Sequence, residues 1–482
     1  MSANSPSPND IPILPIILGG GSGARLWPLS RADMPKQMLA LSGLEPMIVA
    51  TIRRLSAENY LPPIIVCGAD QEPLINASIA EYDLQVGALL LEPVGRNTAP
   101  AIAVAALYAA SISPDALLIV QPSDHAVADM MTLHEALRCA CKTAIAEDRL
   151  VLLGARPTRP ETGYGYIEFG DRFDGQSPAA RVKRFVEKPE LAVAEQFAQS
   201  ASWLWNMGTF VFSAKAILEE LAGARPALLD QCRAAIDRSD RSGPVVRLDH
   251  DSFSAAESIS IDHAVMEKSR RLAVVPLECG WTDLGSWSAL WEIENKDPQG
   301  NVIIGDVEGR DNEGTYLRTD SGLLVSIGLK NAVVISTGDA VFVSDRSRSQ
   351  ELKAVVDGLR DRGRREVQES QRTRQPWGSS ETLATGEGFR VKRILVEPGA
   401  QLSLHLHRHR AEHCVIVRGS ALVEVGDEQR VRHPSENVFI PIGTKHRITN
   451  PGSNPLELIE VQIGSYLGED DVERVADSYG RV

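Results

Sequence analysis

The 482-residue sequence has few cysteines and no pair of them in a CxxC spacing. Six cysteines, between positions 67 and 414, are too few for a disulfide scaffold in a chain of this length. No apolar run reaches about 18 residues, so we expect no membrane-spanning helix. The first residues, MSANSPSPNDIP, contain neither the basic nor the apolar segment of a secretory signal. These absences predict a cytoplasmic protein with no membrane partner.

An excess of positive charge is also lacking. The formal net charge is -14, and this excludes nucleic acid as a main partner because phosphate neutralisation requires clustered Lys and Arg. Hydrophobic residues make up 43% and charged residues 24%, which is ordinary for a globular protein. The length predicts two or three domains. A homo-oligomer is compatible with the sequence, which leaves the oligomeric state open.

Between residue 13 and about residue 124, short apolar runs alternate with helical patterns. The runs ILPIIL, PIIVCG, GALLLEP and ALLIVQPSD are typical of buried parallel strands. TAPAIAVAALYAASI is typical of a helix that begins near Asn97 and Thr98. The alternation predicts an α/β fold with a mostly parallel sheet, in which ligands bind beyond the carboxyl ends of the strands. The glycine-rich stretch after the first run and the PSDH segment both fall there.

The pattern changes near residue 300. Brief alternating runs separated by turn residues predict a small β unit from about 301 to 345. Residues 349–375 are charged and helix-like, which suits a connector. After Trp377 short strands and turns return through about Gly464, as in a sandwich or barrel. We interpret the acidic ending, YLGEDDVERVADSYGRV, as a short helix.

The stretch LGGGSGARLWPLSR fits three interpretations, of which two are weak. A P-loop requires Lys-Ser/Thr after the glycines, and the sequence has none there. A dinucleotide loop requires G-x-G-x-x-G/A, which Gly19, Gly21 and Ala24 satisfy. That loop must also open a long helix, and Pro28 and Pro35 interrupt the segment that follows.

The third interpretation is the loop of a nucleotide-sugar pyrophosphorylase. In such a loop, backbone N–H groups approach a triphosphate, and nearby cations such as Arg25 and Lys36 supply positive charge. A tight strand exit with a surface arginine is the alternative that the loop alone leaves open. The loop residues that would contact the nucleotide are Gly19, Gly20, Gly21, Ser22 and Gly23.

The spacing from this loop through the PKQ segment at 35–37 resembles the signature of sugar-1-phosphate nucleotidyltransferases, and closely that of mannose-1-phosphate guanylyltransferases. Further blocks follow in family order: EPVGRNTAPAI, PSDH, TGYGYI, FVEKP, WNMGTF and GWTDLGSW. The resemblance continues through QPWGSSETL to the final YGR. Nearly the whole chain is therefore similar to bifunctional enzymes that join this guanylyltransferase to a type II mannose-6-phosphate isomerase.

The resemblance implies that the first domain forms GDP-mannose and pyrophosphate from GTP and mannose 1-phosphate. The implied catalytic residues are Arg25 and Lys36, which would hold phosphates, and Asp124 and Asp283, which would bind Mg²⁺. Two carboxylates at strand ends suit this ion, which prefers hard oxygen ligands and keeps several waters. The sugar phosphate is an anionic nucleophile, so positioning and electrostatics would carry the catalysis.

The resemblance also implies further binding residues. The base would meet the glycine-rich loop and the GRNTAP segment, where the candidates are Arg96, Asn97 and Thr98. Glu and Asn suit sugar hydroxyls, which need acceptors and donors, and Lys is a compact charge for phosphate. The candidates for the sugar phosphate in this domain are Gly165, Glu187, Lys188 and Asn206.

Six of the ten histidines lie between positions 405 and 446. Residues 399–419 match the first cupin motif, G-x5-H-x-H-x4-E-x6-G, and residues 435–450 match the second, with Ser where Gly is usual. His405 and His407 are two apart, so on a strand they face the same side. Together with Glu412 and His446 they would bind a divalent transition metal such as Zn²⁺. The alternative is a charged edge strand with solvated histidines.

The resemblance implies that this cupin interconverts fructose 6-phosphate and mannose 6-phosphate through a cis-enediol. Arg410 is our candidate for the cation that steadies the enediolate or binds phosphate, and Lys392 is a second candidate. The sequence departs from the isomerase pattern at His405, where Gln is usual, and at Cys414, where Trp is usual. Two alternatives remain: a different sugar or base for the transferase, or a non-catalytic, sugar-binding cupin that regulates it.

The predicted fold class is α/β: a Rossmann-like mixed sheet of the nucleotidyltransferase type, then a small β unit and a C-terminal cupin β-barrel. The resemblance also implies that the chain supplies GDP-mannose for polysaccharide synthesis. The predicted organisation is a flexible N-terminus (1–12), a nucleotidyltransferase domain (13–295), a small β unit (296–348), a helical connector (349–375) and a cupin isomerase domain (376–482).

Overall fold

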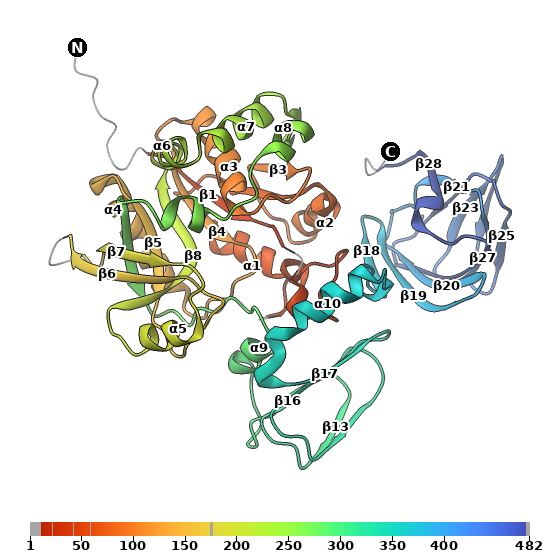
Figure 1. Cartoon of the computed structure of the whole chain (residues 1–482). Helices are drawn as coiled ribbons and strands as arrows, with labels where there is room; N and C mark the ends of the chain where they lie inside the picture. The colour runs from red at the N-terminus through yellow and green to blue at the C-terminus, as the bar shows by residue number, and fades with distance from the viewer. Residues whose placement is uncertain (1–10, 22, 42, 58, 174–176, 479–482) are drawn as a thin grey trace.

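The computed structural model describes residues 11–21, 23–41, 43–57, 59–173 and 177–478. Ser22 of the predicted nucleotide loop, most of the predicted N-terminal segment and the final YGR lie outside the described residues. Figure 1 shows a large α/β domain, a small β unit below it and a β-barrel to one side. No helix of the described chain is long and apolar enough to span a membrane.

The large domain is built on one mixed sheet, whose strand order within the described residues is β5-β11-β7-β6-β8-β4-β1-β2-β3-β10-β9. The predicted strands of the first 124 residues are all present, and β1 pairs in parallel with both β2 and β4. The sheet is composed of β1 (Ile13–Leu18), β2 (Ile64–Gly68), β3 (Ala88–Glu92), β4 (Leu117–Pro122), β5 (Leu150–Ala155), β6 (Tyr166–Arg172), β7 (Ala180–Val186), β8 (Trp203–Ser213), β9 (Asp240–Ser242), β10 (Val245–Arg247) and β11 (Leu272–Leu277).

The strand order reverses between β1 and β4. From β1 the chain adds β2 and β3 on one side of the sheet and then returns to place β4 on the other. In parallel sheets such a reversal leaves a crevice at the carboxyl ends of the two strands, because their following loops diverge. The glycine-rich loop follows β1 and Asp124 follows β4, so the topology brings these two predicted site elements to one crevice.

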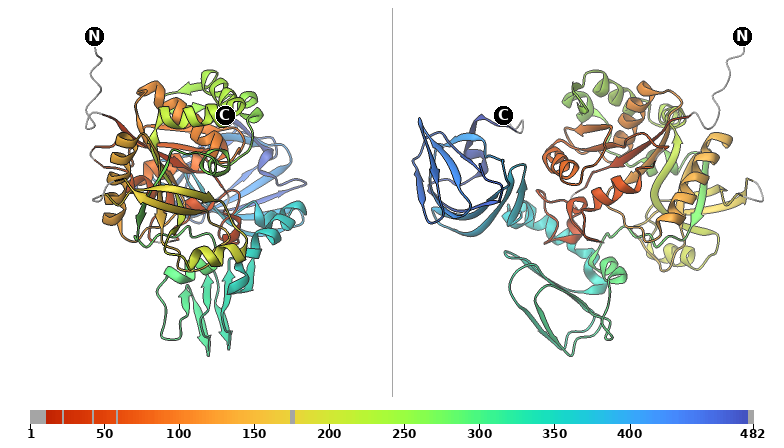
Figure 2. Two further views of the ribbon diagram at one scale, coloured as in Figure 1. Left: turned by 60° about the vertical axis from the view of Figure 1, so that its left-hand side comes forward. Right: turned by 180° about the vertical axis from the view of Figure 1, so that it is seen from behind.

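Helices cover both faces of this sheet (Figures 1 and 2). Alternate residues of β1 enter two separate cores: Ile16 packs on the side of α3, α6 and α7, and Ile17 on the side of α1 and α4. The helices of this domain are α1 (Met47–Arg54), α2 (Glu72–Glu81), α3 (Thr98–Ile112), α4 (Met130–Glu147), α5 (Leu191–Ala198), α6 (Ala214–Ala224), α7 (Pro226–Asp237), α8 (His250–Ala255) and α9 (Trp287–Ile293).

The predicted small β unit is a short parallel coil. Strands β12, β14 and β16 pair in parallel, β13 pairs in parallel with β15, and β17 closes the coil antiparallel to β16. Successive strands thus alternate between two stacked sheets, as in β-solenoids. The strands are β12 (Val302–Ile304), β13 (Val307–Arg310), β14 (Tyr316–Thr319), β15 (Leu324–Ile327), β16 (Ala332–Ser336) and β17 (Val341–Asp345).

The segment interpreted as a helical connector is only partly helical. It contains α10 (Leu352–Asp361), but its end forms β18 (Arg372–Gln375), which pairs with the first long strand of the barrel. Leu352 and Val356 of α10 enter an apolar core together with Leu26 and Trp27 of the glycine-rich stretch. This core, which we call the joint core, also takes in Trp287, Leu290, Tyr316, Val333 and Val367.

The C-terminal domain is an antiparallel barrel formed, in the described residues, by the sheets β18-β19-β20-β27-β22-β25 and β24-β23-β26-β21-β28. The acidic ending expected to be a helix instead forms β28, which pairs with β21. The strands are β19 (Gly378–Gly386), β20 (Phe389–Val396), β21 (Leu404–His407), β22 (Arg410–Arg418), β23 (Ala421–Val425), β24 (Glu428–Arg432), β25 (Asn437–Ile440), β26 (His446–Thr449), β27 (Leu456–Gly464) and β28 (Val472–Ala476).

Candidate active sites

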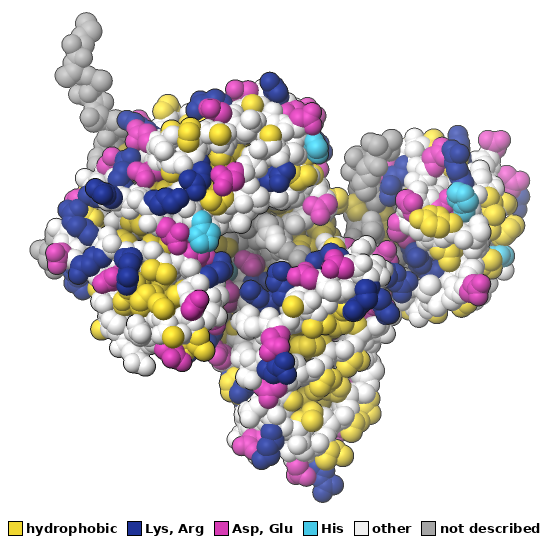
Figure 3. Space-filling view, in the orientation of Figure 1, with side chains coloured by type: hydrophobic (Ala, Val, Ile, Leu, Met, Phe, Trp, Pro, Cys, Tyr) yellow, Lys and Arg dark blue, Asp and Glu magenta, His cyan; other side chains and the backbone are white. Residues whose placement is uncertain are grey.

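Lys36, Asp124 and Asp283, which are far apart in the sequence, meet at the crevice between β1 and β4. The Lys36 Nζ atom donates to Asp124 Oδ2 at 2.8 Å and to the backbone carbonyl of Asp283. Tyr164 donates its hydroxyl to Asp283 Oδ1 at 2.6 Å. Asp124 Oδ1 and Asp283 Oδ2 accept no side-chain hydrogen bond from the described residues, and His125 Nε2 lies 3.8 Å from Asp124 Oδ1, so each carboxylate keeps one oxygen for a further cation. Figure 3 shows that the large domain is hollowed, with basic and acidic side chains around the hollow.

The electrostatics of this centre keep Asp124 ionised. Burial alone would raise the pKa of its carboxyl, but the Lys36 ammonium holds that pKa below its usual range. Burial also lowers the pKa of His125, whose Nδ1 accepts a hydrogen bond from Trp281 at 3.2 Å. A neutral imidazole and an ionised carboxylate therefore lie side by side at the end of β4.

Three contacts fix the glycine-rich loop above Lys36. Gly23 has a φ of +66°, and a side chain at this position would collide with the Lys36 stem, so only glycine fits. Ser30 donates to the Gly23 carbonyl at 2.6 Å, and Gln37 donates to the Gly19 carbonyl at 2.6 Å. The PKQ segment thus supports the loop from below. The long helix of a dinucleotide-binding loop is absent here, and a 3-10 turn, Ala24–Leu26, follows the glycines.

The loop residues predicted to contact the nucleotide differ in whether their hydrogen-bond donors are free. The Gly19 amide already donates to the carbonyl of Val66 at 2.7 Å, so this glycine provides the strand exit rather than a donor. Gly20 and Gly21 are exposed and make no backbone hydrogen bond to the described residues. Arg25 is half-buried and makes no ion pair in the described part of the chain. The two exposed glycines and Arg25 are the groups left free for an anionic ligand.

The GRNTAP residues lie at the N-terminus of α3. Asn97 caps the helix by accepting from the Thr98 amide at 2.8 Å, as the sequence predicts. Thr98 also accepts from the amide of Ile261 at 2.9 Å, and Arg96 donates to the carbonyl of Ser254. The hydrogen-bonding groups of these side chains are therefore partly used within the protein. The N-terminus of α3 forms this part of the site.

Glu92 is the last residue of β3 and lies just before the GRNTAP segment. Its carboxyl is buried. Its Oε1 atom has no hydrogen-bond partner among the described residues. Burial raises the pKa of Glu92 to about 7. Glu92 was not among the predicted site residues, although its position at the carboxyl end of a parallel strand is a signal of such a role.

The predicted sugar-phosphate residues of this domain lie together. A side chain at Gly165 would come within 2.6 Å of the Glu187 carboxylate, so the glycine allows this close approach. Lys188 pairs with Glu187 at 2.5 Å. Asn206 donates to the Asp262 carboxylate at 3.0 Å. Acceptors and donors for hydroxyls thus lie beside one exposed ammonium group.

Tyr164 and Asp262 complete the site and were missed in the sequence. Tyr164 precedes Gly165, and its carbonyl accepts from the Lys188 amide at 3.2 Å while its hydroxyl donates to Asp283. It therefore joins the two-carboxylate centre to the sugar-phosphate group. Tyr164 belongs to the TGYGYI block, whereas Asp262 lies in none of the blocks and had no signal beyond its charge.

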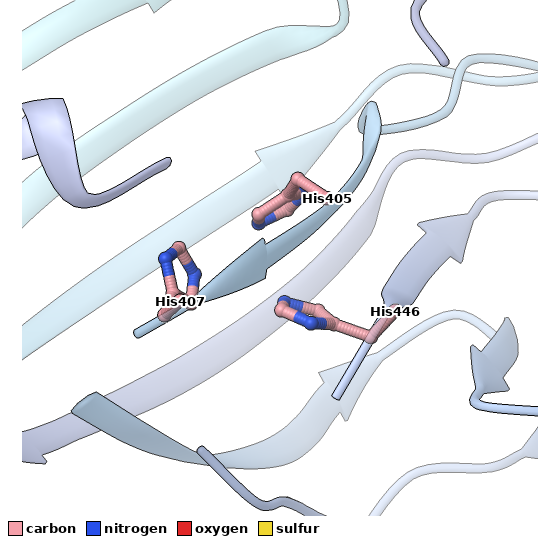
Figure 4. Close-up of side chains that lie close together, drawn as sticks. All are labelled: His405, His407 and His446. Carbon is pink, nitrogen blue, oxygen red and sulfur yellow. The ribbon is translucent and has the colours of Figure 1, made fainter. Parts of the chain in front are cut away.

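The strongest convergence of site residues is in the barrel, where His405, His407 and His446 face one another (Figure 4). One ring nitrogen from each lies within 4.8 Å of the others, a grouping able to hold a metal ion. His405 and His407 come from β21 by the predicted alternation, and His446 is the register partner of His405 on β26. All three side chains are buried.

Backbone carbonyls orient all three imidazoles in the same way. The Nδ1 atoms donate to the carbonyls of Ser403 at 2.8 Å, Asp471 at 3.2 Å and Thr444 at 3.0 Å. This fixes the proton on Nδ1 and leaves Nε2 as the lone-pair donor, the usual arrangement for metal-ligating histidines. Burial lowers the pKa of His405 to about 3, which keeps that ring neutral.

Glu412 of β22 faces the histidines as predicted. Its two oxygens lie 3.0 Å from His407 Nε2 and 3.1 Å from His446 Nε2. Both of these buried nitrogens lack a hydrogen-bond partner in the described structure, which fits atoms that would share a cation with the carboxylate.

Two inward residues of β27 lie behind this carboxylate and were not predicted. Gln462 donates to Glu412 at 3.1 Å and to Glu460 at 2.8 Å. Burial, followed by the charge of Glu412, raises the pKa of Glu460 to about 7. The alternation in LELIEVQIG carries this information, because Glu460 and Gln462 occupy the same face as buried leucines.

The other two candidate residues of the barrel, Arg410 and Lys392, both line its cavity, which has a volume of about 360 Å³. Arg410 is buried, with its Nε atom 3.5 Å from Glu412. Lys392 pairs with Glu469 at 2.6 Å. We call this space, which His405, His407, Lys392 and Glu469 line, the cupin cavity.

Three protein-family profiles match the chain. The Nucleotidyl transferase family profile matches residues 14–300, and the profile of the mannose-6-phosphate isomerase C-terminal family matches residues 362–477. Between them, a MannoseP isomerase/GMP-like beta-helix profile matches residues 307–359. The fold and its two sites define a nucleotidyltransferase joined to a sugar-phosphate isomerase domain of the cupin type.

Full-length relatives narrow the class. The chain is 46% identical to the xanthan biosynthesis protein XanB of Xanthomonas campestris over 97% of this chain and 99% of that protein. It is 43% identical to the alginate biosynthesis protein AlgA of Pseudomonas aeruginosa, with 97% of both chains covered. It is also 43% identical to a mannose-1-phosphate guanylyltransferase of Escherichia coli, covering 97% of this chain and 100% of that one.

A solved structure covers the first part of the chain. It is a Thermus thermophilus protein named as a mannose-1-phosphate geranyltransferase, which is 33% identical, has a TM-score of 0.64 and covers 73% of this chain and 100% of its own. The chain belongs to the family of bifunctional enzymes that combine mannose-1-phosphate guanylyltransferase with mannose-6-phosphate isomerase.

Proposed function

We propose that this chain forms GDP-mannose and pyrophosphate from GTP and mannose 1-phosphate, and that its barrel interconverts fructose 6-phosphate and mannose 6-phosphate. The observation that carries the first activity is the meeting of Lys36 with Asp124 and Asp283 beneath a loop of exposed glycine amides. For the second it is the three-histidine cluster with Glu412 at the base of the cupin cavity.

In the transferase, Arg25, Lys36 and the free amides of Gly20 and Gly21 bind the triphosphate. Mg²⁺ suits the free oxygens of Asp124 and Asp283, and when bound it neutralises charge at the phosphates. These cations position the nucleotide for attack by the sugar phosphate, which needs no protein base because it is already ionised.

On the sugar side of the transferase, Glu187 and Asn206 bind hydroxyl groups of mannose 1-phosphate. Gly165 leaves room for the sugar, and the exposed ammonium of Lys188 binds its phosphate. The base of GTP contacts the start of α3, at Arg96, Asn97 and Thr98. These roles follow from the donors and acceptors that the side chains present to the crevice.

In the isomerase, His405, His407, His446 and Glu412 hold a divalent transition metal such as Zn²⁺. That metal, when bound, supplies a Lewis acid for the C1 and C2 oxygens of the open sugar chain. Arg410, buried beside Glu412, steadies the negative charge that develops when a proton moves between C1 and C2.

The transferase assignment is tested by replacing each carboxylate separately. Asp124→Asn and Asp283→Asn lower kcat for GDP-mannose formation by about 100-fold or more, because each removes an oxygen ligand and a negative charge at the metal. Isomerase activity of the same variants stays at the wild-type level. Asp115→Asn, at an exposed position after α3, serves as the matched control. Normal GDP-mannose formation by either variant would refute the two-carboxylate centre.

The isomerase assignment is tested with His407→Ala and its control His413→Ala, whose ring lies on the outer face of β22. We expect His407→Ala to lose bound metal, as measured by elemental analysis, and to lose fructose 6-phosphate isomerisation by about 100-fold or more. His413→Ala keeps both. If the wild type binds sugar phosphate without isomerising it, the barrel is a regulatory sugar-binding domain instead.

The two reactions are the first and last of three steps, because phosphate must move from C6 to C1 between them. A separate mutase performs that transfer. The relatives named for xanthan and alginate biosynthesis support a role in supplying GDP-mannose for a polysaccharide. All six cysteines are free thiols, which supports a cytoplasmic location.

A further inference from the structure

Three of the cations that line the cupin cavity lie on β20 and β22, on either side of β27, and have little exposure to solvent. Arg390 and Lys392 are two apart on β20, so both side chains point inward, and Arg410 begins β22. Their side chains are only 11%, 12% and 2% exposed, respectively. Cations at this depth need compensating negative charge or bound anions, because burial removes their hydration. Their partners therefore show what the cavity is built to hold.

One short segment, Gly468–Asp471, supplies partners to all three cations. The Glu469 carboxylate accepts from Arg390 at 3.2 Å and from Lys392 at 2.6 Å, in both cases through Oε1. Arg410 donates to the carbonyl of Gly468 at 2.8 Å. The Glu469 side chain is 57% exposed, in contrast to the cations that it contacts. An exposed acid thus covers a buried basic pocket.

The residues on both sides of Glu469 are held independently of its side chain, by Arg410 at Gly468 and by other contacts at Asp471. Asp471 is held by the backbone amide of Arg408 at 3.1 Å and by the His409 ring at 2.8 Å, and its own carbonyl orients His407. In the described structure, by contrast, the side chain of Glu469 hydrogen-bonds only to the two cations. Glu469 can therefore leave the pocket without disturbing the contact that orients a histidine of the metal site.

The cations also differ in their side-chain partners. Arg410 lies against Glu412, with its Nε atom 3.5 Å from the carboxylate, whereas Arg390 and Lys392 hydrogen-bond to Glu469. A hexose 6-phosphate reacts at C1 and C2 and carries its phosphate at the opposite end of the open chain. With the reacting end at the histidines, the phosphate falls on the outer side of the cavity.

We propose that Arg390 and Lys392 form the phosphate subsite of the isomerase, and that the Glu469 carboxylate occupies this subsite until the phosphate of the substrate displaces it. The proposal rests on the isomerase function proposed above. A phosphate dianion carries more charge and more acceptor oxygens than one carboxylate, so the exchange favours substrate. The two cations predicted from the sequence then have different roles. Lys392 binds the phosphate, and Arg410 acts at the reacting end of the sugar.

Steady-state kinetics of the metal-loaded full chain test this assignment. Lys392→Gln and Arg390→Gln raise KM for fructose 6-phosphate about tenfold or more, since each removes a charge-assisted hydrogen bond. Glu469→Gln has the opposite effect and lowers KM several-fold. With unphosphorylated fructose, kcat/KM is the same for wild type and variants. The matched control is Arg393→Gln, on the same strand but on its outer face, paired with Glu457.

Calorimetric titration with inorganic phosphate gives a readout that is independent of turnover. Glu469→Gln binds phosphate several-fold more tightly than wild type, and Lys392→Gln binds it about tenfold more weakly. Thermal unfolding verifies that each variant is folded, and the charge-conserving Arg390→Lys replaces Arg390→Gln if the latter unfolds. Unchanged phosphate binding in Lys392→Gln and Glu469→Gln would overturn the subsite. A wild type that binds phosphate in this way but does not isomerise would overturn the proposed function instead.

Discussion

The Asp262 carboxyl accepts a hydrogen bond from Asn206 on the sugar side of the transferase site. Burial, followed by the charge of Glu187, raises the pKa of Asp262 to about 7. The folded protein therefore binds this proton more tightly than the unfolded chain, where the usual value is 3.8. Its contribution to stability is complete below about pH 4 and is lost as the pH rises to about 7.

As the pH rises from 5 to 8, the free energy of unfolding falls in wild type. We expect it to fall by about 1–3 kcal/mol less in Asp262→Asn. Urea unfolding at a series of pH values measures the difference. Asp230→Asn, at an exposed position on α7, is the control and follows the wild-type curve. Parallel curves for Asp262→Asn and wild type would show that the carboxyl titrates normally in the folded state.

Single residues could be predicted from the sequence where local geometry determines their direction. His405 and His407 are an example, because a spacing of two on a strand places both side chains in the barrel. The proximity of Asp124 to Asp283 depends on the topology of the sheet. It could be predicted from the sequence only through the family resemblance. The alternation of β27 indicates that Glu460 is buried, but its proximity to the charge of Glu412 is visible only once the strands are paired.

At the level of elements, the segment after the glycine-rich loop is clamped to distant parts of the chain. The buried Arg31 forms a two-point ion pair with Asp339 after β16, at 2.6 and 2.7 Å. It also donates to the carbonyls of Pro28 and Glu369. Asp33 accepts from the backbone and side chain of Ser370, just before β18. One short segment thus contacts the β coil and the connector at once.

Arg31→Ala lowers the free energy of unfolding by about 3–5 kcal/mol, because it leaves the Asp339 carboxylate partly buried and unpaired. Replacing both partners, as in Arg31→Met with Asp339→Leu, recovers much of this loss. Chemical denaturation measures both effects. Arg310→Ala, at an exposed position, changes stability by less than about 0.5 kcal/mol. Equal destabilisation by the single and double variants would contradict the ion-pair account.

Two elements show why sequence patterns failed locally. The β28 strand has a charged, exposed sequence without alternation, and it is extended because it pairs with β21. The coil of β12–β17 was expected as a β unit, but its parallel stacking was not, since runs of three to five residues do not specify their partners. In contrast, β1 to β4 and α3 were predicted, because long apolar runs and a cap are local signals.

At the scale of the whole molecule, the joint core contradicts the idea of separable parts. A chain ending at residue 300 lacks the joint-core residues beyond that position, against which Leu26, Trp27 and Trp287 pack. Each large side chain that becomes exposed costs roughly 1.5–3 kcal/mol. We expect chain 1–300 to bind a hydrophobic dye and to unfold well below the temperature of chain 1–371, which keeps α10 and Val367. Indistinguishable melting curves and dye binding would show that the joint core is dispensable.

The joint core also determines when the nascent chain can complete its packing during synthesis. Leu26 and Trp27 leave the ribosome early, but Val367 completes their packing only after the β coil and α10 have been made. At about 5–20 residues per second, the interval between residues 300 and 367 lasts roughly 3–13 s. During that time the nascent transferase exposes tryptophan and leucine side chains. Chaperone capture is expected to concentrate in this window, and slow codons between residues 300 and 367 would lengthen it.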